Sequence, residues 1–243
     1  MSSKTSKANI KNVFIFIVLI VIGVAISWYV VNYPKDSIVS RFITYDRIIN
    51  LLLQHIYIVF LSSILAIATS VPLGIILTRP RFKKLNSPVM GIVNIGQTVP
   101  SLAIIALFVS VLGIGVKTAI FALWIYSLLP ILNNTIAGIQ SVDTSIIEAA
   151  KGIGMKPIKI LTKVELPLVL PIIIAGIKTA VVINIGNAVL ATFVGAGGLG
   201  DLIIAGNNIN RWQILMLGTS LPVLMAFAVD YLLTIFENSL KKA

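Results

Sequence analysis

Long apolar segments alternate with short polar ones along most of this sequence. A helix needs roughly 20 apolar residues to cross the hydrocarbon core of a bilayer. By that measure the pattern predicts spans at residues 12–31, 51–77, 88–112, 118–136, 167–193 and 212–236. The segment 32–49 mixes charges, aromatics and Pro34, and is predicted to be an external loop. We therefore expect an all-α membrane protein, a polytopic bundle of about six transmembrane helices.

The predicted spans divide into two parts. Residues 1–49 would form an N-terminal transmembrane helix with its external loop, and residues 50–243 the core membrane domain, with a polar loop at 138–167. Small residues recur at every fourth position of the second span, where they allow helix backbones to approach closely in lipid. This ridge, which predicts a helix–helix contact, consists of Ser62, Ala66, Ser70 and Gly74.

Residues 148–167 form the longest polar-studded run between apolar segments. Upstream, Ser145 and Glu148 have the spacing of a capping box, in which each side chain bonds a free backbone N–H of the first helical turn. Ala149 and Ala150 favour helix, and Gly154 tolerates the left-handed backbone that often ends one. The pattern predicts a short helix closed by a glycine turn.

A second short helix is predicted to follow that turn. Pro157 suits the first turn of a helix because its missing N–H would have no helical partner there. Ile158, Leu161 and Val164 are predicted to share one face, with lysines on another. Pro167 closes the unit and opens the next span.

Composition and charge agree with a membrane protein. The mean hydropathy is +1.03, only 11% of residues are charged, and the chain has no cysteine. The net charge of +11 could suggest nucleic acid, but most of the 19 Lys and Arg cluster on alternate polar segments, which by the positive-inside rule are cytoplasmic. That rule places the polar loop and both termini inside; the inner cations include Lys4, Lys7, Lys11, Arg79, Arg81, Lys83, Lys84, Lys151, Lys156, Lys159, Lys163, Lys241 and Lys242.

Several polar residues fall inside predicted spans, where lipid cannot satisfy them. Gln97, Pro100, Asn184 and Asn187 are candidates to line a translocation path; the alternative is hydrogen bonding between helices, with a tolerated proline kink. The lone His55 is expected to be a polar side chain at the membrane interface.

Two charges, Lys178 and Asp230, lie within the fifth and sixth spans. Both are nearer the inner boundary, and the long lysine stem can reach toward that side. We expect them to pair or to share one polar pocket. The alternative places Asp230 among the lipid headgroups and Lys178 against helix carbonyls or a cavity.

The glycine run Gly195, Gly197, Gly198 and Gly200 contains the letters G-x-G-x-x-G of a dinucleotide-binding motif. That motif requires a preceding strand in a soluble βαβ unit. Here it follows a predicted membrane helix, so we interpret the run as a bend near an outer gate. We find no Walker A sequence, no metal-ligand cluster and no catalytic set; we expect no enzyme activity, no metal and no cofactor bound by this chain.

The polar loop resembles a known element. Glu148-Ala149-Ala150, followed at fixed spacing by Gly154, Val164, Leu166 and Pro167, is similar to the EAA loop of ABC importer membrane subunits, which couples them to the ATPase. The stretches QTVPSLAIIALFVSVLGIG and GNAVLATFVGAGGLGDLI resemble permeases for glycine betaine, carnitine and choline.

The resemblance, which covers nearly all of residues 50–240, implies a MetI-like type I importer fold and a role as permease subunit for a small compatible solute or quaternary amine. Its implied partners are cytoplasmic ATPase subunits, an external substrate-binding protein and a second permease subunit, identical or not, in a bacterial inner membrane. An importer for another polar solute or an amino acid, a secondary transporter or channel, and a membrane scaffold are the alternatives; nucleic acid is not an expected partner.

Overall fold

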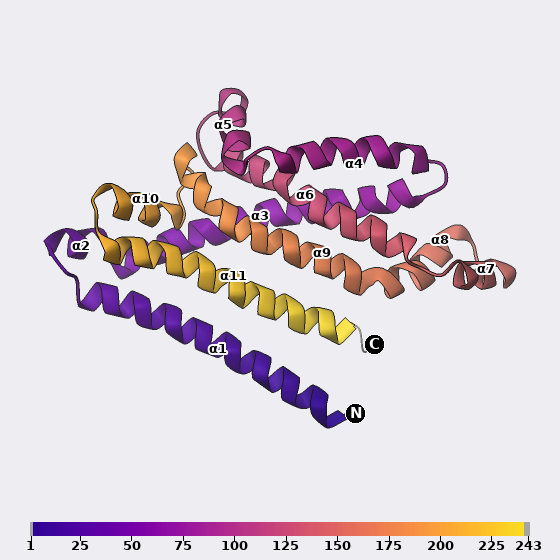
Figure 1. Ribbon diagram of the computed structural model, residues 1–243, viewed down its shortest axis with the longest axis horizontal. Helices are drawn as coiled ribbons and strands as arrows, with labels where there is room; N and C mark the ends of the chain where they lie inside the picture. Colours follow the sequence, from indigo (N-terminus) through magenta and orange to yellow (C-terminus); the bar gives the residue numbers. More distant parts are fainter. Residues whose placement is uncertain (1, 241–243) are drawn as a thin grey trace.

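The computed structural model describes residues 2–240, with side chains from residue 14 onward; Lys241 and Lys242 lie outside the described residues, as do the side chains of Lys4, Lys7 and Lys11. Helices make up nearly all of this part of the chain (Figure 1). In order they are α1 (Ser2–Asn32), α2 (Ser37–Phe42), α3 (Tyr45–Thr78), α4 (Lys83–Thr98), α5 (Ser101–Leu112), α6 (Val116–Gln140), α7 (Thr144–Gly152), α8 (Pro157–Ile160), the π-helix η1 (Leu161–Glu165), α9 (Leu166–Asn187), the 3-10 helix η2 (Ala188–Val194), α10 (Gly200–Asn208) and α11 (Trp212–Leu240).

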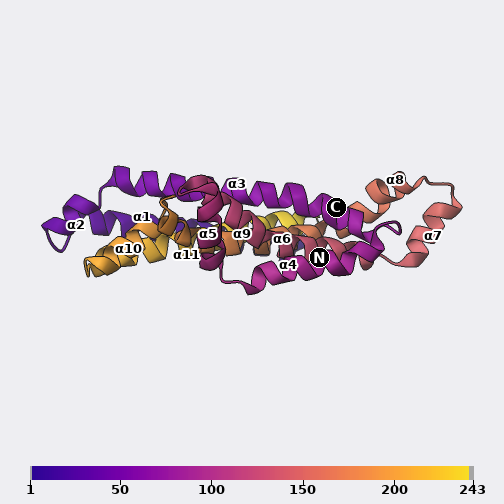
Figure 2. The ribbon, with the colours of Figure 1, turned by 90° about the horizontal axis from the view of Figure 1, so that it is seen from above.

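The long helices α1, α3, α6, α9 and α11 run along one axis of a flat bundle (Figures 1 and 2). Each is long and apolar enough to cross a membrane, and together they match five of the predicted spans. The start of α1 and the end of α11 lie toward the end of the bundle that carries α7 and α8, while α2 and α10 lie at the opposite end.

The third predicted span is not one straight helix. It is divided into α4 and α5, whose axes meet at 100°. Pro100 has no backbone N–H and disfavours helical angles at Val99, and both residues adopt extended ψ angles of 135° and 130°. Pro100 was a candidate path residue, with a tolerated kink as the alternative; it instead breaks the span, and α5 folds across the end of α6 that is remote from α7 (Figure 1).

The small-residue ridge of α3 lies against α6, as predicted. Ser62, Ala66, Ser70 and Gly74 are all buried. A Cβ atom on Gly74 would lie 2.7 Å from the Thr135 side chain of α6, so only glycine permits this approach. Close backbone packing therefore joins the two helices.

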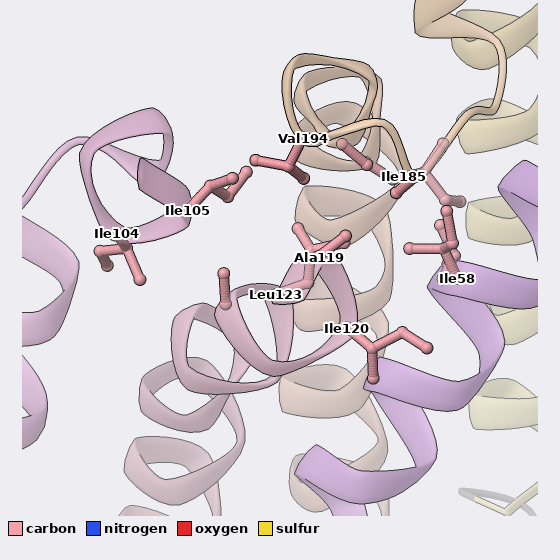
Figure 3. Close-up of a cluster of buried hydrophobic side chains, with 13 residues drawn as sticks. Ile58, Ile104, Ile105, Ala119, Ile120, Leu123, Ile185 and Val194 are labelled. Carbon is pink, nitrogen blue, oxygen red and sulfur yellow. The ribbon is translucent and has the colours of Figure 1, made fainter. Parts of the chain in front are cut away.

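A cluster of buried aliphatic side chains joins the broken span to the rest of the core (Figure 3). Ile104 and Ile105 of α5 face Ala119 and Leu123 of α6, and Val194 of η2 extends the same cluster. Burying such side chains contributes roughly 1.5–3 kcal/mol each in water, whereas inside a bilayer close packing supplies the attraction.

The segment 32–49, expected to be a loop, is more ordered than predicted. It contains α2, and α3 already begins at Tyr45, where the Thr44 side chain accepts a hydrogen bond from the Arg47 amide. Asp36 caps α2 and pairs with Arg211 at 2.6 Å, which holds the segment against the α10–α11 turn.

Candidate coupling site

The polar loop begins with α7, but its cap is not the predicted one. The carboxylate of Asp143 accepts a hydrogen bond of 2.9 Å from the Ser145 amide, so Ser145 lies inside the helix and Glu148 is exposed on its surface. This bond lowers the pKa of the Asp143 carboxyl below its usual value of 3.8. The predicted Ser145–Glu148 capping box is therefore wrong, because an acidic cap two residues upstream takes its place.

The predicted glycine turn follows α7. Gly154 has a φ of +79°, in the left-handed region, and the Met155 amide donates to the Ala150 carbonyl at 3.1 Å. This six-to-one bond is typical of a left-handed helix end. Pro157 then occupies the first turn of α8. The predicted sequence of helix, glycine turn and helix is confirmed.

A π-helix joins α8 to the membrane helix α9, and the sequence pattern did not predict it. Ile160 and Glu165 are five residues apart and both are buried. Five residues in an α-helix would leave them about 140° apart, whereas the wider π turn brings them to the same side. The predicted apolar face is accordingly wrong at Ile158, which is 64% exposed, while Leu161 and Val164 are half-buried.

Glu165 forms an ion pair with Arg79, the C-cap residue that follows α3. The guanidinium donates two hydrogen bonds, from Nη1 to Oε1 at 3.2 Å and from Nη2 to Oε2 at 2.5 Å. The Glu165 side chain is 7% exposed and that of Arg79 is 30% exposed. Sequence reasoning missed this pair, although both residues lie at the inner boundary of predicted spans and carry opposite charges.

The ion pair lies in the wall of a groove of about 560 Å³ beneath the loop. The ends of α3 and α6 form one side, and α7 and α8 form the other; the lining includes Thr78, Ile139, Gln140, Ile147, Met155 and Ile160. The outer surface of the loop exposes its lysines together with Ile153, at 79%, and Ile158. Exposed apolar side chains surrounded by cations can contact another protein whose surface is apolar and acidic.

The residues of the loop that were predicted to contact the ATPase differ in their exposure. Ala150 is buried, Val164 and Leu166 are half-buried, and Glu148, Ala149, Gly154 and Pro167 are exposed. Glu148 and Ala149 are thus available for contact with a partner, whereas Ala150 packs beneath them.

The candidate path residues lie in two places. Near the α4–α5 break, Gln97 donates to the Tyr126 carbonyl at 3.0 Å, and Ser101, next to the exposed Pro100, donates to Asn187 at 3.4 Å. Asn184 belongs to α9 and is fully buried where α9 faces α3. There its amide donates to Ser62 and Ser63 at 3.1 and 3.2 Å.

The glycine run forms the turn between η2 and α10, at the end of the bundle opposite α7 and α8 (Figure 1). Gly195, Gly197 and Gly198 all have positive φ, and Gly200 begins α10. The Gly198 amide donates to Gln54 at 3.1 Å, and the Leu199 amide donates to His55 Nδ1 at 3.4 Å. The run therefore bends the chain, as predicted, and is attached to α3.

His55 is not the interfacial side chain that was expected. It is fully buried, and its Nε2 atom lies 3.0 Å from the Ile185 carbonyl of α9. Because Nδ1 accepts a hydrogen bond, the tautomer protonated on Nε2 satisfies both contacts. His55 thus joins three parts of the chain that lie far apart in sequence.

The two intramembrane charges are close together, as expected. Lys178 Nζ of α9 lies 3.8 Å from Asp230 of α11. It also lies 3.5 Å from Glu237 and donates a hydrogen bond to Thr234 at 3.2 Å, and both of these residues are in α11 as well. Glu237 was not predicted as a partner. Among the described residues, no three His, Asp or Glu side chains are arranged to hold a metal.

Solved structures of transporters share this architecture. A chain of the MetNI methionine ABC transporter in an inward-facing conformation matches 80% of this chain and 96% of its own, with a TM-score of 0.73 and 22% identity. An amino acid ABC transporter matches 80% of this chain and 94% of its own, with a TM-score of 0.67 and 18% identity. These similarities confirm the expected MetI-like fold.

Sequence relatives are closer. The choline transport system permease protein OpuBB of Bacillus subtilis is 46% identical over 190 residues, 78% of this chain and 87% of that protein. The glycine betaine/carnitine/choline permease OpuCB of Bacillus subtilis is 45% identical over 76% of this chain and 84% of that protein. The osmoprotectant import permease protein OsmY of Salmonella typhimurium is 44% identical over 77% of this chain and 79% of that protein.

The family comparison agrees with these relatives. Residues 70–242 match the family described as "Binding-protein-dependent transport system inner membrane component". Such a family implies a substrate-binding protein and an ATPase as partners, and its membrane component is a transport subunit. The chain therefore belongs to the multi-pass inner-membrane components of binding-protein-dependent ABC transport systems.

Proposed function

We propose that this chain is the permease subunit of an ATP-driven importer for a small quaternary amine of the glycine betaine, carnitine or choline type. The observation that carries the proposal is the identity of 44–46% to permeases of those solutes over more than three quarters of the chain. The helix–turn–helix loop, with Glu148 and Ala149 exposed at its surface, provides a surface for the ATPase.

The orientation follows from charge. The loop, the start of α1 and the end of α11 lie toward the same end of the bundle, and the cationic segments are near that end (Figure 1). By the positive-inside rule this end is cytoplasmic. The substrate-binding protein then meets the opposite end, where α2, α10 and the glycine turn lie.

A second permease subunit completes the assembly. ATP-driven closure of the ATPase dimer moves the loops, and the spans change from an inward-facing to an outward-facing arrangement. The solute passes between the two permeases near the α4–α5 break, where Gln97, Pro100 and Asn187 lie. The glycine turn at the outer end acts as part of the gate, and the chain binds no cofactor.

The test is uptake by the reconstituted complex. This chain and its ATPase are reconstituted in vesicles loaded with ATP, and radiolabelled choline, glycine betaine and carnitine are added outside together with the binding protein. Uptake of at least one solute that requires ATP supports the proposal. Uptake that persists without ATP and follows an ion gradient would instead indicate a secondary transporter, and uptake of an amino acid alone would replace the solute class.

A further inference from the structure

The Arg79–Glu165 pair joins two elements that are 86 residues apart in sequence. Its two parallel hydrogen bonds, at 3.2 and 2.5 Å, match the planar guanidinium to both carboxylate oxygens. A bidentate contact of this kind fixes the relative orientation of its partners as well as their distance. When one of them moves as a rigid unit, the other must follow or the pair must break.

Each partner is held firmly to its own element. Arg79 is the C-cap of α3, and its guanidinium also donates to the Ile75 carbonyl at 3.3 Å and to Thr78 Oγ1 at 3.0 Å. Glu165 is the last residue of the π-helix and is followed without a break by α9. The pair thus connects the loop side of α9 directly to the end of α3.

Holding the loop against the bundle does not by itself require an ion pair such as Arg79–Glu165. Desolvating two charges is costly, and apolar side chains of similar volume often hold buried surfaces together as well or better. What the ion pair adds is a fixed geometry at the joint between the loop and the bundle. The π turn serves this geometry, because it orients Glu165 toward the interior together with Ile160.

We propose that Arg79 and Glu165 are a pair of positioning residues that transmits the movement of the 138–167 loop to α3 during ATP-driven transport. This inference rests on the proposed function. Neither residue needs to touch the solute or the nucleotide. Their contribution is to make α3, and α6 packed against its small-residue ridge, respond when the ATPase moves the loop.

The test compares Arg79→Gln, Glu165→Gln and the double variant in the reconstituted complex with its ATPase and binding protein. The readout is the amount of solute transported per ATP hydrolysed, measured on complexes of verified composition. Coupling free energies between sites typically correspond to factors of about 5–150, so we expect each single variant to lower this ratio at least about fivefold. Because the two residues act as one contact, the double variant should be no worse than either single variant.

Arg81→Gln is the matched control. Arg81 is two residues away, is exposed, and lies over the Phe82 ring at 5.8 Å. Its replacement removes the same charge at the same boundary and should leave the ratio unchanged. If the glutamine variants assemble poorly, Arg79→Lys is used instead. Lysine keeps the charge but cannot form the bidentate contact with Glu165, so it should still lower the amount of solute transported per ATP.

A merely structural pair would reduce the amount of assembled complex while each complex kept the wild-type ratio, and that result overturns the inference. Losses that multiply in the double variant overturn it as well, since they show independent roles. A wild-type complex that lacks ATP-dependent uptake would instead reject the proposed function. The two failures are therefore distinguishable.

Discussion

The ammonium of Lys178 lies between two carboxylates, 3.8 Å from Asp230 Oδ1 and 3.5 Å from Glu237 Oε2, in the space between α9 and α11. The side chains differ in exposure, with Asp230 at 44% and Glu237 at 12%. One cation thus serves two acids, and the more buried acid is the closer one. The three residues should therefore differ in their importance for stability.

We expect Lys178→Met to destabilise the protein most, by roughly 2–3 kcal/mol, because it removes one ion-pair contact from each of the two acids at once. Asp230→Asn should cost less than about 1 kcal/mol, since Asp230 is partly exposed and Glu237 still pairs with Lys178. Thermal unfolding of the purified subunit in detergent measures both changes. Equal losses for the two variants would contradict this ordering.

The turn after α7 provides a matched pair of glycines. Gly154 has a φ of +79°, whereas Gly152 lies within α7; an added Cβ would meet no other group at either position. Gly154→Ala should strain the turn by about 1–2 kcal/mol and reduce solute-stimulated ATPase activity of the assembled complex. Gly152→Ala should keep that activity, because alanine favours helix. Normal stimulation in Gly154→Ala would show that the left-handed turn is not needed for coupling.

The cap of α7 predicts a dependence on pH. Because the Ser145 amide lowers the pKa of Asp143 in the folded chain, the cap stabilises α7 fully above the usual value of 3.8 and is lost as the pH falls through the lowered pKa. Asp143→Ala should speed hydrogen exchange of the α7 amides at neutral pH and remove this dependence on acid. Asp143→Asn should keep protection, since asparagine also caps helices.

Glu148→Ala is the comparison within the same helix. Glu148 is exposed and does not cap α7, so the variant should exchange like the wild type while still affecting contact with the ATPase. Faster hydrogen exchange in Glu148→Ala than in Asp143→Ala would show that the predicted capping box, and not Asp143, stabilises the start of α7.

The glycine turn should not bind nucleotides. In a dinucleotide site the backbone amides of the glycine loop face the pyrophosphate. Here the amides of Gly198 and Leu199 donate to Gln54 and His55, and the nearby Asp201 accepts from Thr192. Titration calorimetry of the purified subunit with NAD should give no binding heat; saturable heat that Gly198→Val abolishes would refute this assignment.

The sequence predicted the features that depend on neighbouring residues. Apolar length located the membrane helices, and small-residue spacing located the α3–α6 contact. The sequence shows a proline at position 100, which indicates a possible break in the helix. The 100° angle between α4 and α5, however, depends on how α5 packs against α6 and η2. The partners of His55 and Arg79 are 130 and 86 residues away, and no local pattern encodes contacts of that range.

The π-helix has a consequence for how the loop can vary. A single residue removed from 161–165 would convert the π turn to an α-helical one and leave Ile160 and Glu165 four residues apart, about 40° from each other around the helix. Glu165 would then still face Arg79, and α7 and α8 would keep their orientation about the α9 axis. Exposed positions such as Thr162 and Lys163 can therefore accept many side chains, and the segment can also lose one residue. The wide turn thus allows the length of this segment to vary by one residue while the contact between Glu165 and Arg79 is kept.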